Sequence, residues 1–472
     1  MVFPVVGGDG KPTGYEISNS LRFDPGDNSH LSRTPSSEGN KRTFTLSFWA
    51  KIRPDYASDT STNNFFTARN SGGYTTGIQQ ISGGYIQAFI YDNTGGEEYK
   101  LKLVTNAAFR DSSSWYHIVF AVDTTQGTAS NRGKLYVNGS QITSFSTATY
   151  PDQNFDSHIN DDVPHYIANK DGTNDDYDGH LAEMYLIDGT QYAASNFGET
   201  DDNGVWIPKE AKDDLTFGTN GFFLEFKQTG TSANASGKGA DTSGQDNHFD
   251  DQNITVAEIT TDTPTNNFAT LNALDAGRSG DLSYGNLYYN SPTSAREQAR
   301  SNIGLTQGKW YYECRQNSAN GGTSVGVLKE NVDMTLDDSL GKDDYGWAYD
   351  SDGSSRHNNS STSSGFASFT TGDIIGVALD LDNHDIYFYK NGTVQNSGTK
   401  AFDLDTGELY FPAFGSNSNG STDQMTANFG NPPYTISGSF PSESDANGYG
   451  NFSYEPPSGY YSICTKNLAE YG

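Results

Sequence analysis

The sequence predicts an all-β protein built from two β-sandwiches, and three observations lead to this fold class. Residues Asp373 to Gly392 (DIIGVALDLDNHDIYFYKNG) alternate with a period of two, turn near Asn383 and alternate again, as a β-hairpin does. A fainter copy lies upstream, where Trp115 to Asp123 (WYHIVFAVD) precedes Lys134 to Gly139 (KLYVNG). The composition, with 52 Gly and 13% aromatic residues, is typical of short strands and tight turns around aromatic cores.

The first sandwich is expected over residues 15–227. Its strands alternate apolar and polar residues, and FTLSFWAKI at residues 44–52 is the cleanest example. Further strands are expected at residues 15–23, 85–91, 101–104, 115–122, 134–137, 180–187 and 221–226. Residues 1–14 are expected to be an anchoring segment held by an assembly.

Residues 228–262 are polar and rich in Gly and Ser, which predicts a connector between the sandwiches. The second sandwich is expected over residues 263–432, with strands at 309–314, 324–328, 345–349 and 409–414 beside the hairpin. Residues 433–472 form a tail rich in Pro, Gly and Tyr. Only residues 193–196 and 294–301 are short candidates for a helix.

The net charge of −30 argues against binding nucleic acid or anionic membranes through a basic surface. The N-terminus has no basic region followed by an apolar core, so no signal peptide is expected, and no apolar run is long enough to span a membrane. The two cysteines, Cys314 and Cys464, do not make a disulfide framework. A buried free thiol is expected at Cys314, with a bridge to Cys464 left open.

Two sets of motifs carry resemblances to known families. SLRF, FTLSFWAKI, WYHIVFAVD, KLYVNG and DGHLAEMYLIDG, in this order, resemble the laminin-G-like branch of the concanavalin A-like sandwiches. GKWYYE, YGWAYD, the hairpin and YFPAFG resemble a SPRY domain. The resemblance implies two concanavalin A-like jelly rolls. It also implies carbohydrate or protein binding through loops, sometimes with calcium at the sandwich rim.

The whole layout resembles virion and tail-fibre-type structural proteins of phages that infect marine bacteria. The phrases DTPTNNFATLN and YEPPSGYYSICTKNL carry this likeness. It implies a protein that is made in the host cytoplasm and acts outside the cell as part of the virion. Its partners would be other virion subunits, copies of itself and bacterial surface polysaccharide, without nucleic acid or a membrane span.

An acidic loop, DGTNDDYDGHLAE, is the candidate metal site, with ligands Asp171, Asp175, Asp176 and Asp178. Calcium takes oxygen ligands, and neighbouring carboxylates need a cation or solvent between them. The loop is not an EF-hand, because its sixth position is Asp176 rather than Gly. A solvated loop is the alternative. Asp152, Asp156, Asp161 and Asp162, on an adjacent acidic loop, could complete a calcium site.

Candidate binding residues lie in loops of both domains. Tyr56, Tyr74 and Tyr150 are loop aromatics that could stack on sugars. By resemblance, the SPRY recognition surface would include the polar segment 350–364, with Arg356 and His357 beside Tyr349. Arg356 is the only cation of that segment and could anchor a carboxylate or sugar hydroxyls. A flexible loop is the alternative.

No catalytic motif of the hydrolase, metalloprotease or nucleotide-binding type is present, so the protein is not expected to be an enzyme. Glu183 and Glu225 are the least implausible carboxylate pair for glycoside hydrolysis. The expected function is a phage appendage that displays binding modules for a host glycan or protein. The alternatives are an adaptor or decoration protein that binds only virion subunits, and a polysaccharide depolymerase.

Overall fold

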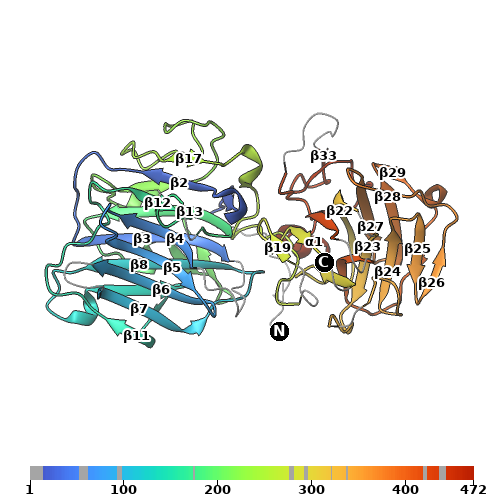
Figure 1. Ribbon diagram of the computed structural model, residues 1–472, viewed down its shortest axis with the longest axis horizontal. Coiled ribbons are helices and arrows are strands. Elements are labelled where there is room, and N and C mark those ends of the chain that lie inside the picture. Colours follow the sequence, from blue (N-terminus) through green and yellow to red (C-terminus); the bar gives the residue numbers. More distant parts are fainter. Residues whose placement is uncertain are drawn as a thin grey trace. The chain divides into compact units, whose positions relative to one another are not determined.

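The computed structural model describes residues 14–52, 62–92, 98–173, 176–275, 281–291, 296–319, 322–335, 338–417, 422–434 and 443–472. The chain divides into two compact units (Figure 1). The N-terminal unit is Pro12–Thr265, and the C-terminal unit contains Asn266–Gly472. Strands dominate the described part of both units, which confirms the predicted all-β class with two sandwiches.

The first sheet of the N-terminal unit runs in the order β10-β9-β8-β3-β13-β1-β18, and β16 pairs with β13. The central strand β3 pairs with β8 along the expected run, and Phe48 faces the interior with 0% of its surface exposed. The strands of this sheet are β1 (Ser20–Phe23), β3 (Thr43–Ile52), β8 (Trp115–Asp123), β9 (Gly133–Val137), β10 (Ser140–Ile142), β13 (Gly179–Asp188), β16 (Phe222–Leu224) and β18 (Ile259–Thr260).

The second sheet of this unit runs in the order β11-β7-β6-β5-β4-β12-β2-β17. Its inner face packs on the first sheet through aromatic pairs such as Phe65 with Phe48, whose ring centroids lie 5.2 Å apart. The strands of this sheet are β2 (His30–Arg33), β4 (Asn63–Arg69), β5 (Thr75–Ile81), β6 (Tyr85–Asp92), β7 (Glu98–Ala108), β11 (Phe145–Thr149), β12 (His165–Ile167) and β17 (Asp250–Gln252). A small hairpin joins β14 (Gly198–Thr200) to β15 (Trp206–Pro208).

The segment 228–262 differs from a free connector, because it completes the N-terminal sandwich. β17 pairs with β2 (Figure 1) and β18 pairs with β1, so the segment adds an edge strand to each sheet. Phe249 and Ile254 are buried in the main core of this unit. These two apolar side chains help to dock an otherwise polar stretch, since each buried side chain contributes about 1.5–3 kcal/mol.

The C-terminal unit is also a sandwich of two antiparallel sheets. The first runs β19-β20-β32-β22-β27-β28-β29 with β30 beside β28, and the second runs β21-β31-β23-β24-β25-β26. Tyr312 of β22 meets Phe414 of β31 with ring centroids 6.1 Å apart, which places the core between the sheets. The predicted hairpin is confirmed as β27 and β28, which pair from Ile375 with Lys390 to Asp380 with Asp385.

The strands of the C-terminal unit are short at its edges and longest at its centre. The first sheet consists of β19 (Asp281–Ser283), β20 (Tyr288–Asn290), β22 (Lys309–Ser318), β27 (Ile374–Asp380), β28 (Asp385–Lys390), β29 (Thr393–Val394), β30 (Phe402–Asp403) and β32 (Gln424–Asn428). The second sheet consists of β21 (Glu297–Arg300), β23 (Thr323–Lys329), β24 (Gly346–Asp350), β25 (Ser354–His357), β26 (Ser360–Thr362) and β31 (Tyr410–Ser416).

Helices are brief in the described residues. The one α-helix is α1 (Thr465–Tyr471), and single 3-10 turns are η1 (Pro25–Asp27), η2 (Ala129–Asn131), η3 (Ala194–Asn196), η4 (Lys212–Asp214), η5 (Val256–Glu258) and η6 (Asn396–Gly398). The helical candidate at 294–301 is wrong where it is described, because Glu297–Arg300 is strand β21 and pairs with β31. No described helix has the length and apolar character needed to cross a membrane.

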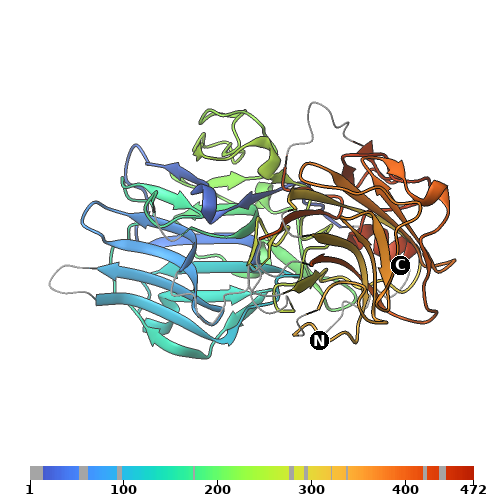
Figure 2. The same ribbon diagram turned by 45° about the vertical axis from the view of Figure 1, so that its right-hand side comes forward.

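The segment after residue 432 lies on the outer face of the C-terminal unit's first sheet. It carries the short hairpin of β33 (Glu443–Ser444) and β34 (Asn451–Phe452), followed by α1. In two views of the ribbon this segment, coloured red, lies within the C-terminal unit (Figures 1 and 2). Phe452 is fully buried, with its ring centroid 5.0 Å from that of Tyr311. Cys314 and Cys464 are free and buried.

Candidate functional site

A groove of about 430 Å³ lies on the outer face of the N-terminal unit's second sheet. The register of the last three strands of this sheet builds it, because Tyr166 of β12, Ser32 of β2 and Asp250 of β17 lie opposite one another in one row. Their neighbours Leu31 and Ile167 point inward and are fully buried, so the row faces solvent. The strand β17, which lies in the segment predicted to be a connector, thus supplies one wall.

Two basic side chains complete the lining of this groove. The Arg33 guanidinium donates to the Asn247 side-chain oxygen, and burial lowers the pKa of Arg33. His248 accepts a hydrogen bond at Nδ1 from the Asp241 backbone N–H at 2.9 Å, so its exchangeable proton sits on Nε2. The groove therefore joins an aromatic face to a cation, a carboxylate and hydroxyls.

The described part of the acidic loop, residues 171–173 and 176–178, borders the groove at Gly172. Gly172 packs against the Tyr166 ring, and its φ of +86° keeps the backbone close to that ring. Asp171 lies 3.7 Å from the Arg69 guanidinium, Asp176 accepts from the Asn169 side chain, and Asp178 is 1% exposed. Asp175 is outside the described residues. The described carboxylates are thus engaged with different neighbours.

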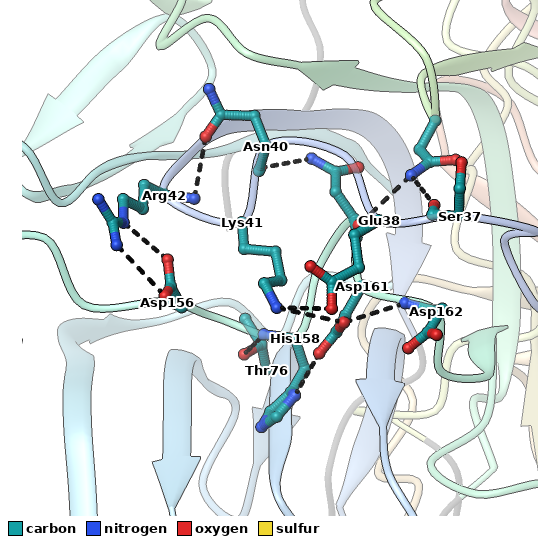
Figure 3. Close-up of polar contacts among 12 residues, drawn as sticks. Ser37, Glu38, Asn40, Lys41, Arg42, Thr76, Asp156, His158, Asp161 and Asp162 are labelled. Carbon is teal, nitrogen blue, oxygen red and sulfur yellow. Dashed lines mark hydrogen bonds and ion pairs between the residues drawn. The ribbon is translucent and has the colours of Figure 1, made fainter.

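A different set of carboxylates does converge, at one end of the same sandwich (Figure 3). Single oxygens of Glu38, Asp161 and Asp162 all lie within 4.8 Å of one another, and no other such group of three occurs in the described ranges. Lys41 Nζ reaches into the group, 3.1 Å from Glu38 and 3.4 Å from Asp161. The ammonium already supplies the positive charge that the carboxylates require.

His158 and Tyr74 extend this cluster. His158 Nδ1 lies 3.2 Å from Asp161 Oδ2, and the His158 ring stacks on Tyr74 with centroids 5.8 Å apart. Burial raises the pKa of Asp161, but the contacts with His158 and Lys41 outweigh it and lower the pKa below its ordinary value. Tyr74 is thus held by His158. Tyr150 packs against the core instead, and Tyr56 is outside the described residues.

The expected recognition segment of the second domain forms two tight hairpins rather than a loop. β24, β25 and β26 pair in sequence, with positive φ at Gly353, Asn358 and Asn359 in the turns. The alternation of apolar and polar residues that predicts a strand is absent here, because β25 and β26 consist of polar residues. Gly and Asn at the turns were the available clue.

The three residues predicted on that segment make internal contacts. Tyr349 has 0% exposed surface, donates to the Ala367 carbonyl and is therefore a core residue rather than a ligand contact. Arg356 pairs with the buried Asp350 carboxylate at 2.7 Å. His357 stacks on Trp347 with ring centroids 4.3 Å apart.

Of the predicted carboxylate pair, Glu183 sits at a β-bulge in β13 and Glu225 directly follows strand β16. Glu183 has a φ of 43° at this bulge, is 4% exposed and accepts a hydrogen bond from the Tyr15 hydroxyl. Burial raises the pKa of Glu183 to about 8, with a smaller contribution from the nearby Glu225 charge. A substrate would have little access to this carboxyl, and neither carboxylate lines the groove at Tyr166.

Comparisons with known proteins agree with these two sandwiches. Residues 25–194 match the family described as the concanavalin A-like lectin/glucanases superfamily, of laminin G type, and residues 309–432 match the SPRY domain family. The chain carries a laminin-G-like domain followed by a SPRY domain. No curated protein sequence matches the chain.

Solved structures are similar to about a third of the chain. The SPRY domain of human HERC1 is 24% identical over 33% of this chain and 96% of its own, with a TM-score of 0.29. Stonustoxin is 25% identical over 34% of this chain and 27% of its own, with a TM-score of 0.29. The PSpry domain of TRIM65 is 16% identical over 34% of this chain and 88% of its own, with a TM-score of 0.27.

Proposed function

We propose that the chain is a non-enzymatic binding protein of a phage virion appendage, a tail fibre or capsid fibre, that attaches to a glycan on the host surface. The observation that carries this proposal is the groove at Tyr166. A half-buried ring supplies a flat apolar face, while Arg33, His248 and Asp250 place donors and acceptors around it. Sugars expose apolar C–H faces ringed by hydroxyls, so this mixture suits them.

The two domain families are of binding type, and the sequence resembles phage structural proteins in layout. A shallow open groove gives weak single-site binding. Several copies of the chain on one particle would raise the avidity without any new contact, so a homo-oligomer is part of the proposal. The protein would be made in the host cytoplasm and act outside the cell, beside other virion subunits.

Binding of the full-length protein to immobilised bacterial surface polysaccharides tests this function. We expect Tyr166→Ala to weaken binding at least about tenfold, since the loss of an aromatic anchor costs more than 1.4 kcal/mol. Tyr74→Ala is the matched control, because Tyr74 is also half-buried on the same unit but lies at the carboxylate cluster. The proposal requires wild-type binding in this control.

Two outcomes would replace this function by another. Binding to purified virion subunits but to no host polysaccharide would make the chain an adaptor. Shortening of the polysaccharide chains during incubation, measured by size-exclusion chromatography, would make it a depolymerase. Loss of that shortening in Glu183→Gln would assign the chemistry to the bulge carboxyl.

A further inference from the structure

A second cavity, of about 170 Å³, lies on the outer face of the C-terminal unit's first sheet. Its origin is the alternation along β22. Tyr312, Cys314 and Gln316 point into the core and are fully buried, so Arg315 and Asn317 point outward and are only half-buried. Both outward residues line the cavity.

Described residues of the C-terminal segment cover Glu313, the outward residue that precedes these two along β22. Glu313 is fully buried under them and accepts hydrogen bonds from the backbone N–H groups of Ser453 and Tyr454, both at 2.9 Å. Arg315 lies one step further along the same face. The cavity therefore lies next to the covered part of the sheet, and Pro433 and Tyr434 of the C-terminal segment line it.

Aromatic side chains wall this cavity. The strand register places Tyr288 of β20 and Arg315 of β22 on either side of Thr426 in β32. Tyr284 stands beside Tyr288, with ring centroids 5.7 Å apart, and Tyr434 lies under the guanidinium, whose Cζ is 5.1 Å from the ring centroid. The cation–π contact orients the arginine without neutralising it.

Arg315 differs from the comparable arginines of this unit. Arg356 pairs with Asp350 at 2.7 Å, and Arg300 pairs with Asp275. The Arg315 side chain has neither an ion pair nor a hydrogen bond to any residue that the structure describes. The chain has 59 acidic residues for 29 basic ones, so carboxylates are abundant. A half-buried guanidinium that pairs with none of the described ones is therefore unexpected in this chain.

We propose that this cavity binds the carboxylate of an acidic sugar, such as a uronic acid residue of a polysaccharide. The planar guanidinium matches a carboxylate through two parallel hydrogen bonds. The Tyr284 and Tyr288 rings offer a face for the pyranose. The Asn317 side chain, which accepts from the Thr426 hydroxyl at 2.7 Å, leaves its amide N–H groups for sugar hydroxyls.

The size of the cavity supports a single sugar unit. Its volume of about 170 Å³ is below the roughly 300–1,000 Å³ of sites that enclose drug-sized ligands. The site belongs to the C-terminal unit, whereas the groove at Tyr166 belongs to the N-terminal unit. The proposal therefore stands or falls independently of the function proposed above.

Titration calorimetry of the full chain with an oligoglucuronate and with its neutral glucose counterpart tests the proposal. We expect the acidic oligosaccharide to bind roughly tenfold tighter or more, as a charge-assisted pair predicts. Arg315→Gln should abolish this preference, and Arg315→Lys should restore part of it, because the charge returns without the two-pronged geometry. Arg296→Gln, at an exposed arginine of the same unit, is the control and should bind as the wild type does.

Equal affinity of the wild type for both oligosaccharides, or an unchanged preference in Arg315→Gln, would overturn the proposal. Sodium acetate is the probe for a site that needs only a carboxylate. Competition by acetate at the same concentration as glucuronate would overturn the sugar assignment. Tyr166→Ala should leave the acidic preference intact, which separates this site from the groove.

Discussion

Lys51 Nζ lies 2.7 Å from Asp262 Oδ2 in the interior of the N-terminal sandwich, and the two side chains are 3% and 2% exposed. The other carboxylate oxygen accepts from Trp115 Nε1 at 3.2 Å. Asp262 is the last residue of the segment that the sequence presents as a connector. A buried ion pair therefore fixes the end of this segment to strand β3.

Asp262→Ala is expected to destabilise the N-terminal unit by about 3–5 kcal/mol, because it removes one half of a buried ion pair. Urea unfolding followed by fluorescence measures the change. Asp156→Ala is the matched control, since Arg42 Nε and Asp156 Oδ1 are also 2.7 Å apart but the side chains are 44% and 50% exposed. That loss should cost about 0.2–1 kcal/mol. Equal losses in the two variants would contradict the prediction.

The stability of the N-terminal unit should fall as the pH rises, because of Glu183. Burial raises its folded-state pKa from 4.5 to about 8, so the folded state holds up to one more proton than the unfolded state between these values. The protonated Glu183 carboxyl contributes fully to the free energy of unfolding below pH 4.5. This contribution falls by up to about 1.4 kcal/mol per pH unit and is lost as the pH rises through 8. Glu183→Gln stays neutral and still accepts from Tyr15, so this part of the slope should disappear.

Melting temperatures measured from pH 5 to pH 8 check this expectation. Glu210→Gln removes one carboxylate at an exposed position and controls for the change in net charge. A slope that is the same in Glu183→Gln and in the wild type would show that this carboxyl does not carry the effect.

Local pattern was sufficient for the hairpin at Asp373 to Gly392. Its strands alternate, and its turns place His384 and Asn391 at positive φ, as polar turn residues allow. The run at Glu297–Arg300 misleads because Glu, Gln, Ala and Arg favour helices, whereas pairing with β31 makes it a strand. Propensity is local, and strand pairing across more than a hundred residues overrides it.

The sites were harder to predict than the fold, because each joins residues that are distant in the chain. The acidic loop at Asp171 can be recognised in the sequence by its closely spaced carboxylates. The carboxylates that converge, however, include Glu38, which lies too far from Asp161 in the sequence for any local motif to connect them. The groove needs Ser32, Tyr166 and Asp250 in one row, and only the register of three strands brings them together.

The C-terminal segment should be an integral part of the SPRY domain's stability. Phe452 is fully buried against Tyr311, so Phe452→Ala is expected to cost about 3–5 kcal/mol. Calorimetry of the full chain should show a lower melting temperature for the C-terminal unit alone. Tyr345→Ala, at an aromatic residue that is 38% exposed in the same unit, should change it by less than about 0.5 kcal/mol. Similar effects of the two substitutions would mean that the segment detaches readily.

Calcium should have little effect on the carboxylate cluster of the wild-type protein. Lys41 lies 3.1 Å from Glu38 and 3.4 Å from Asp161, so a divalent cation would have to displace the ammonium from the same oxygens. We expect about 1 mM calcium to leave the melting temperature of the N-terminal unit unchanged. Even a site with a dissociation constant of about 1 mM would raise the free energy of unfolding by only about 0.4 kcal/mol at this concentration.

Lys41→Met removes the competing charge and leaves the carboxylates to repel one another. This variant should melt at a lower temperature without calcium and recover when calcium is added, since oxygen ligands and positive charge are then both required. Lys41→Met combined with Asp161→Asn should lose the recovery. A calcium-dependent rise in the wild type that Asp161→Asn removes would show instead that the cation, and not Lys41, is the natural partner of these carboxylates.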